Sequence, residues 1–206
     1  MLHQSRETVP SLIRDHREWH RGRSEYALWL IELESSELHR KVEAARKHLS
    51  EFLLKPYHRQ PHVTLFVCGF FVDTPLFDDD YSAQQFRHHE CLLNDSNIEP
   101  FAIEVGGLNS FTSAPFLEIR DRDNGIGRVR AALSAATKEI GRDTFTPHVT
   151  IGLYSGTFPG SIVSRKLAAF PEDPCTLTVD RITFAVYRAQ ELAGALTYRH
   201  HVSLST

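Results

Sequence analysis

Two histidines in this sequence each precede a threonine by two positions, within short apolar runs rich in β-branched residues. The first run is Pro61-His62-Val63-Thr64-Leu65, and the second is Pro147-His148-Val149-Thr150-Ile151. Alternate residues of a β-strand project to the same face of its sheet. We therefore expect each histidine to lie beside its threonine on one face, while the valine between them faces a core.

Two imidazoles and two hydroxyls in one cleft would suit a displacement at phosphorus. Imidazole titrates near neutral pH, so one ring can accept a proton while the other, protonated, donates one. A cyclic 2′,3′-phosphate or a 2′–5′ linkage fits such a pair, because its leaving ribose oxygen must be protonated. We predict that His62 and His148 are the catalytic groups. Thr64 and Thr150 are expected to bind the phosphate oxygens.

The surroundings of the two motifs repeat as well. A strand-like run at 26–33 precedes a helical pattern of apolar residues, and a second strand-like run at 115–119 precedes another. The apolar positions recur every three or four residues, as on one face of a helix. They are Leu38, Val42, Ala45, Leu49 and Phe52 in the first pattern, and Ile126, Val129, Leu133, Ala136 and Ile140 in the second. The sequence thus predicts an α+β fold with two pseudo-symmetric strand-helix-strand lobes. Their antiparallel-rich sheets should surround a central cleft.

Other segments are assigned by pattern and turn residues. The first motif strand should run to about Phe71, and the second from His148 to Tyr154. A strand at 101–105 should end at Gly106-Gly107, residues 82–93 and 162–170 should be helical, and residues 179–187 and 196–204 should form a closing hairpin. The acidic loop at 73–80 is expected to be solvated.

Two aromatic residues are candidates for stacking on the base of a nucleotide. Strand alternation places Tyr154 on the face of His148 and Phe66 on the face of His62. Stacking on an aromatic ring contributes about 1–3 kcal/mol per base. We expect Tyr154, and after it Phe66, to bind the substrate, although Phe66 could instead fill the core.

Composition limits the classes of function. The chain has 206 residues and a net charge of −3, so no overall basic field attracts long nucleic acids. Its three cysteines lack metal-binding spacing and suit a reducing compartment. The N-terminus lacks the apolar core of a signal peptide, and no apolar run reaches membrane-spanning length. We expect a cytoplasmic monomer that does not bind membranes.

Residues 1–22 are polar and rich in arginine and histidine, and we interpret them as an appended N-terminal arm. Pro10 could open a short helix that reaches Trp19. His16 and His20 have the spacing of a helical metal pair, but no glutamate completes a His-Glu-x-x-His motif. A solvated helix face is the better interpretation. Residues 23–206 then form a single bilobal domain.

The paired motifs resemble those of the two-histidine (2H) phosphoesterases, a family that includes the bacterial 2′–5′ RNA ligase-like proteins. Its signature is two His-x-Ser/Thr-hydrophobic motifs, matched here by His62-Val63-Thr64-Leu65 and His148-Val149-Thr150-Ile151. The resemblance extends over residues 24–204. It implies a bilobal α+β fold around a cleft and cleavage or formation of phosphodiesters at the 2′ position, with no metal or other cofactor.

Three functions remain open on the sequence alone. The favoured one is a phosphodiesterase that acts on 2′,3′-cyclic phosphates or 2′–5′ linkages in nucleotides or RNA ends, with 2′–5′ RNA ligation as a variant. The second is a non-catalytic binder of RNA ends or cyclic nucleotides. The third is a metal-dependent hydrolase that uses some of the twelve histidines. Two histidines with hydroxyls make a poor zinc site, because no carboxylate stands beside either motif.

Overall fold

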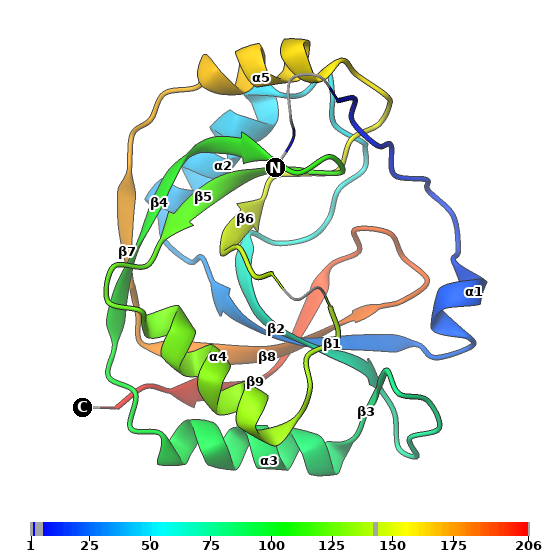
Figure 1. The fold of residues 1–206 in the computed structure, drawn as a ribbon, viewed down its shortest axis with the longest axis vertical. Helices are drawn as coiled ribbons and strands as arrows, with labels where there is room; N and C mark the ends of the chain where they lie inside the picture. Colours follow the sequence, from blue (N-terminus) through cyan, green and yellow to red (C-terminus); the bar gives the residue numbers. More distant parts are fainter. Residues whose placement is uncertain (1, 3–5, 142–143, 206) are drawn as a thin grey trace.

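A single curled sheet, covered by helices, forms the framework of the protein (Figure 1). The computed structural model describes residue 2, residues 6–141 and residues 144–205. Its strands are β1 (Glu25–Glu32), β2 (His62–Phe71), β3 (Asp80–Tyr81), β4 (Phe101–Ser110), β5 (Pro115–Arg120), β6 (His148–Thr150), β7 (Cys175–Val179), β8 (Arg181–Arg188) and β9 (Leu196–Ser203). Its helices are α1 (Arg17–His20), α2 (Ser36–His48), α3 (Ala83–Asp95), α4 (Gly125–Ala136) and α5 (Gly160–Ala168). The predicted α+β class is confirmed.

The order of the strands contains the expected symmetry. It runs β7-β4-β5-β6-β2-β1-β8-β9, and the short β3 pairs with β2 in parallel. The two motif strands are antiparallel neighbours in the middle of the sheet, with Val63 opposite Val149. Each motif strand pairs on its other side with the strand that opened its unit, β1 for β2 and β5 for β6. The two lobes are therefore halves of one continuous sheet, joined at this seam.

The four longer helices lie in two pairs at opposite ends of the curled sheet, and the single turn α1 lies apart from both (Figure 1). There α2 and α5 lie together at the top, and α3 and α4 at the bottom. Most of the predicted apolar stripes are buried: Leu38, Val42 and Ala45 of α2 have exposed fractions of 1% or less, and Val129 and Leu133 of α4 have none. Helix α4 ends at Ala136, so the second stripe does not continue in a helix to Ile140 as expected. Helix α2 ends at His48, earlier than the pattern indicated, and Leu49 and Phe52 are buried in the turns that follow. None of the helices in the described ranges is both long and apolar enough to cross a membrane.

Two expected strand boundaries are wrong. The pair Gly106-Gly107 does not end a strand: β4 continues to Ser110, and the register with β5 shifts between Val105 and Leu108. Such a shift is a β-bulge, which accommodates extra residues in one strand without ending the pairing. In contrast, β6 contains only His148–Thr150 and does not extend to Tyr154.

The acidic loop at 73–80 is exposed from residue 73 to residue 78, as expected, but its last two aspartates make contacts with the domain. Asp80 is 8% exposed, and its carboxylate accepts hydrogen bonds from the backbone amides of Leu76 and Phe77. Arg23 donates to Asp79 and to Asp80 over 2.5 and 2.6 Å. Two of the three consecutive aspartates thus hold Arg23, so the expectation of a solvated loop fails only at its end.

The N-terminal arm folds back against the domain instead of standing apart from it. Of the expected helix from Pro10 to Trp19, the structure shows only the single turn α1, at Arg17–His20. His20 is buried and bonds through Nε2 to the carboxylate of Asp15, over 2.6 Å. Residues 1 and 3–5 of the expected arm lie outside the described residues.

Candidate active site

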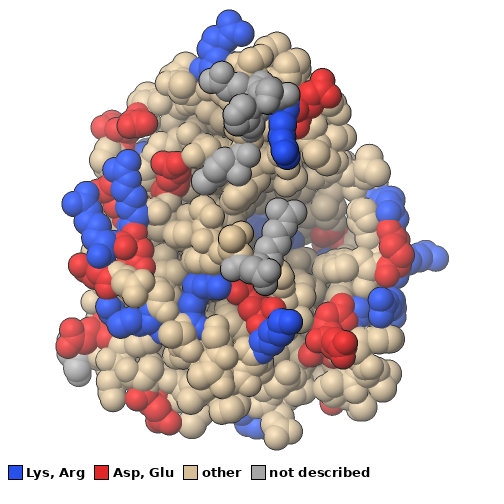
Figure 2. Space-filling view, viewed as in Figure 1, with Lys and Arg blue, Asp and Glu red and all other residues tan. Residues whose placement is uncertain are grey.

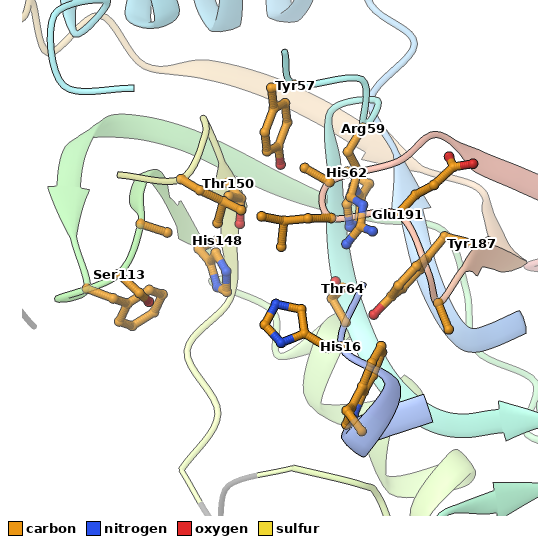
Figure 3. A pocket seen from close by; sticks show the side chains of 17 residues that line it. His16, Tyr57, Arg59, His62, Thr64, Ser113, His148, Thr150, Tyr187 and Glu191 are labelled. Atoms are coloured by element: carbon orange, nitrogen blue, oxygen red, sulfur yellow. The ribbon is translucent and has the colours of Figure 1, made fainter. Parts of the chain in front are cut away.

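A cavity of about 530 Å³ opens at the seam between the two halves of the sheet (Figure 3). His62, Thr64, His148 and Thr150 all line it, contributed by β2 and β6. The antiparallel pairing of β2 with β6 explains this convergence, because Val63 and Val149 face each other at the seam and each lies between a histidine and a threonine. The structure thus brings together the four residues that the two motifs singled out.

The two histidines make the same hydrogen bond. Nδ1 of His62 lies 2.8 Å from the carbonyl oxygen of Gln60, and Nδ1 of His148 lies 2.7 Å from that of Thr146. A carbonyl oxygen can only accept, so Nδ1 carries the proton in both rings. Each neutral ring therefore keeps an unprotonated Nε2, and the backbone bond fixes the ring orientation. Either histidine can act as a base at Nε2, or as an acid there once protonated.

Burial lowers the pKa of both rings. The pKa of His62 falls to about 4, mainly because burial disfavours the charged ring, and the charges of Arg59 and His148 lower it further. Its bond to Gln60 opposes this effect. Burial also lowers the pKa of His148, again opposed by the backbone bond. His62 is thus the ring that more strongly favours the neutral form.

Phe66 does not reach the cavity, which corrects the stacking expectation for this residue. Strand β2 contains a bulge, since Trp29 pairs with Phe66 but the next residue, Leu30, pairs with Thr64. The extra residue, Leu65, reverses the alternation, so Phe66 points into the core. Phe66 is fully buried, with its ring edge-on to His89 at 5.2 Å between centroids.

Tyr154 is also absent from the cavity, and its expected stacking role is corrected. Strand β6 ends at Thr150, so strand alternation no longer applies four residues later. Tyr154 is 1% exposed and packs in a cluster with Leu49, Phe52 and Val163. Its hydroxyl lies 2.6 Å from that of Ser110, which satisfies the buried polar group.

Other aromatic and charged residues line the cavity in their place. Arg59 stacks its guanidinium on the ring of Tyr187 at 3.9 Å and donates from Nε to the carbonyl of Gly194. Phe111 lies edge-on to His148, with 5.0 Å between ring centroids. The position of Arg59, three residues before His62, is a signal that could have been found in the sequence. Tyr187 and Phe111 are distant from both motifs and carry no such signal.

The arm also contributes to the cavity. His16 and Trp19 line it together with the motif residues. Figure 3 shows the imidazole of His16 projecting into the cavity from the arm. His20 is instead buried against Asp15, so the two histidines do not form a pair. Across residues 2, 6–141 and 144–205, no group of three or more His, Cys, Asp or Glu side chains is arranged to hold a metal ion.

The fold matches solved structures at low sequence identity. Escherichia coli LigT complexed with 3′-AMP is 16% identical with a TM-score of 0.62, covering 89% of this chain and 99% of LigT. A protein of Thermus thermophilus is 15% identical with a TM-score of 0.58, covering 87% of this chain and 97% of its own. A phosphoesterase is 14% identical with a TM-score of 0.57, covering 88% and 99%. A comparison with curated protein sequences gave no significant match.

A family model describes the sequence itself. The model of the 2′–5′ RNA ligase superfamily matches residues 34–191, a range that contains both His-x-Thr motifs. This range is well over half of the chain, and the resemblance to the two-histidine phosphoesterases is confirmed. The chain belongs to the 2′–5′ RNA ligase superfamily.

Proposed function

We propose that this protein is a phosphodiesterase that acts on 2′,3′-cyclic phosphates or 2′–5′ linkages in nucleotides or RNA ends. The observation that carries the proposal is the matched pair of histidines at one cavity, each with Nδ1 bonded to a backbone carbonyl and with no hydrogen bond from Nε2 to any described residue. Such a pair supplies the base and the acid that an in-line displacement at phosphorus requires.

In the proposed reaction, water attacks the phosphorus of the bound phosphodiester. One histidine accepts the proton of this water at Nε2 as the new oxygen–phosphorus bond forms. The other histidine donates its Nε2 proton to the ribose oxygen as the old phosphorus–oxygen bond breaks. We assign His62 as the base, because its pKa of about 4 keeps it unprotonated, and His148 as the acid. His62 then releases its proton to water and His148 takes one up, which restores the starting state.

Thr64 and Thr150 are proposed to hold the phosphate in line. Both are partly exposed at the cavity, one beside each histidine along its strand. Their hydroxyls can donate to the non-bridging oxygens, where negative charge resides in the transition state. Arg59 adds a positive charge at the same cavity. With Tyr154 and Phe66 buried, the ring of Tyr187 or Phe111 is the better candidate to contact the base.

Nucleotides are the substrate class that we favour. LigT has been solved in complex with 3′-AMP, ATP, NADP+ and phosphate, and it shares the fold of this chain. A cavity of about 530 Å³ is also within the usual range of about 300–1,000 Å³ for small-molecule sites. These likenesses support a nucleotide or an RNA end as the bound group.

The test is a panel of 2′,3′-cyclic nucleotides, 2′–5′ dinucleotides and RNA with a terminal cyclic phosphate, assayed in excess EDTA. The position of the product phosphate is read by ³¹P NMR. We expect hydrolysis of at least one class, lost in both His62→Ala and His148→Ala. Binding without turnover would favour a non-catalytic binder, and activity restored only by Zn²⁺ or Mn²⁺ would favour a metal hydrolase.

Ligation is the second candidate, because the family model takes its name from a 2′–5′ RNA ligase activity. The same two histidines would serve this transesterification, in which the 5′-hydroxyl of a second RNA replaces water as the attacking group and the 3′-oxygen of the cyclic phosphate leaves with a proton. Incubation of 2′,3′-cyclic-phosphate RNA with a second RNA bearing a 5′-hydroxyl would reveal it. A joined product that exceeds the hydrolysed one would favour the ligase.

A further inference from the structure

The N-terminal arm is attached to the second half of the sheet at its beginning. Glu7 forms a bridge with Pro159, and the amide of Val9 donates to the carbonyl of Thr112 over 2.7 Å. Thr8 is 2% exposed; its hydroxyl donates to the carbonyl of Gly156 and accepts from the amide of Phe158, both over 2.8 Å. This end of the arm is therefore held by buried, satisfied hydrogen bonds.

The other end of the arm is attached to the first half. The ring of Trp19 packs against Tyr26 and Phe70, with 4.9 and 4.8 Å between centroids. Arg23 follows, with its guanidinium 3.6 Å from the centre of the Phe70 ring and hydrogen-bonded to Asp79 and Asp80. The arm thus spans the two halves and crosses the open side of the curled sheet (Figure 1).

Between these two attachments, the arm turns one imidazole toward the cavity. His16 lies among the residues that line the cavity, and Figure 3 shows it in the same opening as His148 and Thr64. Nδ1 of His16 lies 3.5 Å from the carboxylate of Glu18, which also bonds Arg14. The neighbouring Leu12 and Ile13 are more than 60% exposed. The polar side chain of His16 therefore lines the cavity beside Trp19, while Leu12 and Ile13 face solvent.

We propose that residues 6–22 form a fixed wall of the substrate site, that His16 contacts the bound substrate, and that the arm selects nucleotides and chain ends over internal positions of RNA. This inference rests on the proposed function. An imidazole can donate to a phosphate oxygen or hydrogen-bond a base or ribose edge. A segment held at both ends across the open side leaves no path there for a continuing RNA chain.

The role of His16 is tested with His16→Ala and His16→Gln, using His88→Ala on the exposed face of α3 as the matched control. A lost hydrogen bond to a charged group corresponds to about a tenfold or larger effect. We expect KM for a 2′,3′-cyclic nucleotide to rise about tenfold in His16→Ala and less in His16→Gln. His88→Ala should behave as the wild type. An unchanged KM in His16→Ala would overturn the contact.

Binding provides a measurement that needs no turnover. Adenosine 2′-monophosphate is titrated calorimetrically into the wild-type protein and into His16→Ala. We expect Kd to rise about tenfold in the variant. If the wild type hydrolyses nothing, the proposed function fails, yet this titration still tests His16. Equal Kd values in a protein that turns over substrate would overturn the inference and leave the proposed function standing.

The selection of ends is tested by loosening the arm away from the cavity. Thr8→Val removes the hydroxyl that bonds Gly156 and Phe158, whereas Thr8→Ser retains it as the control. The wild type should cleave a 2′–5′ dinucleotide at least tenfold more efficiently than the same linkage in the middle of a dodecamer. We expect this preference to fall at least threefold in Thr8→Val and to persist in Thr8→Ser. Equal cleavage of both substrates by the wild type would overturn the selection, whether or not Thr8→Val folds.

Discussion

At the scale of single residues, burial and one backbone hydrogen bond define the chemistry of the two histidines. Each Nδ1 is committed to the carbonyl two residues before it, so the reactive nitrogen is the same in both rings. His62 is 8% exposed and its pKa falls to about 4. The pKa of His148, which is partly exposed, is also lowered by burial. This difference in burial is the basis for the proposed assignment of His62 as the base and His148 as the acid.

Removal of either imidazole should remove most of the activity. General acid and base groups contribute about 10²–10⁴-fold each, so His62→Ala and His148→Ala should each lower kcat by about that factor. His88→Ala, at an exposed position on α3, is the matched control and should leave kcat unchanged. Steady-state hydrolysis of the preferred cyclic nucleotide measures the effect. A variant of either motif with near-normal kcat would exclude that residue from the reaction.

The pH dependence should differ between the free and the bound enzyme. kcat/KM follows the free enzyme, in which burial places both pKa values below the usual 6.5 of histidine. It should therefore peak below pH 6.5, because the acid loses its proton above its lowered pKa. A bound phosphate anion raises both pKa values, so kcat should peak at a higher pH. Rates over pH 4–9 test this. A rate that only rises toward alkaline pH would show that no histidine acts as the acid in the reaction.

The sequence predicted the two motif pairs because both rest on local strand alternation, which holds at His62–Thr64 and His148–Thr150. It failed for Phe66 and Tyr154 because the alternation was extended past a bulge and past a strand end. Neither event has a local signal in the sequence. Tyr187 and Phe111 reach the cavity through pairing with distant strands, and no pattern near the motifs indicates this.

At the scale of elements, β2 links the site to the loop that holds Arg23. Gly69 in this strand has φ +111°, and a Cβ at this position would lie 2.3 Å from the carbonyl oxygen of Asp79. Gly69→Ala should therefore lower the free energy of unfolding by about 2–3 kcal/mol, through both backbone strain and the clash. Gly106→Ala, where the added Cβ has only an ordinary contact at 3.7 Å, is the control. Urea unfolding would measure both, and equal stability of the two variants would contradict the strain.

Helix α3 carries a buried histidine that should make stability depend on pH. His89 is fully buried and bonds Trp29, Tyr81 and Thr137. Burial lowers its pKa to about 4, below the value of about 6.5 in the unfolded chain. The unfolded state therefore binds the proton first, and stability present above pH 6.5 is lost as pH falls toward 4.

The contribution of His89 is measured as a difference between two pH values. Between pH 7.5 and 5, His89→Gln should lose about 1–2 kcal/mol less unfolding free energy than the wild type. His88→Gln, at the exposed neighbouring position, should show the full loss. Urea unfolding of the wild type and both variants at the two pH values gives the three losses to be compared. Identical losses in the two variants would mean that His89 does not titrate between the two states.

Element boundaries were predictable where side chains alone determine them. Ser82 caps α3 through a reciprocal bond with Gln85, and the apolar stripes of α2 and α4 face the core as expected. The glycine pair in β4 and the aspartates at 79–80 were misread because their roles depend on partners far along the chain. Long-range pairing decides these cases, and a single sequence does not display it.

At the scale of the whole molecule, the curled sheet places the seam between β2 and β6 at the cavity. The two halves contribute equivalent histidines and threonines, and the described part of the arm joins the halves across the open side. The sequence indicated only an appended arm, because nothing in its composition reveals that Thr8 and Trp19 pack on different halves. The repeated halves of the sheet were visible in the sequence, whereas the arm that crosses its open side was not.

The charge distribution leads to a prediction about salt. The net charge is −3, and Figure 2 shows Lys and Arg interspersed with Asp and Glu over the visible face, without a continuous basic stripe. Many of these charges are paired, as Arg120 and Arg122 are with Glu104. Binding should therefore involve only one or two phosphates, those near Arg59 and the histidines. For single strands, the logarithm of affinity falls by about 0.7 per phosphate contact and decade of salt.

The logarithm of affinity for a cyclic-phosphate RNA end should consequently fall with a slope of about −0.7 to −1.4 against the logarithm of salt concentration. The slope should not steepen when the RNA grows from two to ten nucleotides, because the mixed charges on the face seen in Figure 2 give the added phosphates no continuous basic stripe. Arg59→Gln should make the slope about 0.7 less negative, the equivalent of one phosphate contact. Arg122 follows β5 and pairs with Glu104, so Arg122→Gln should leave the slope unchanged. Binding of His148→Ala to fluorescent RNA at 50–300 mM KCl measures these slopes. A slope steeper than about −3, or one that grows with RNA length, would indicate an extended RNA-binding face and contradict a site built for ends.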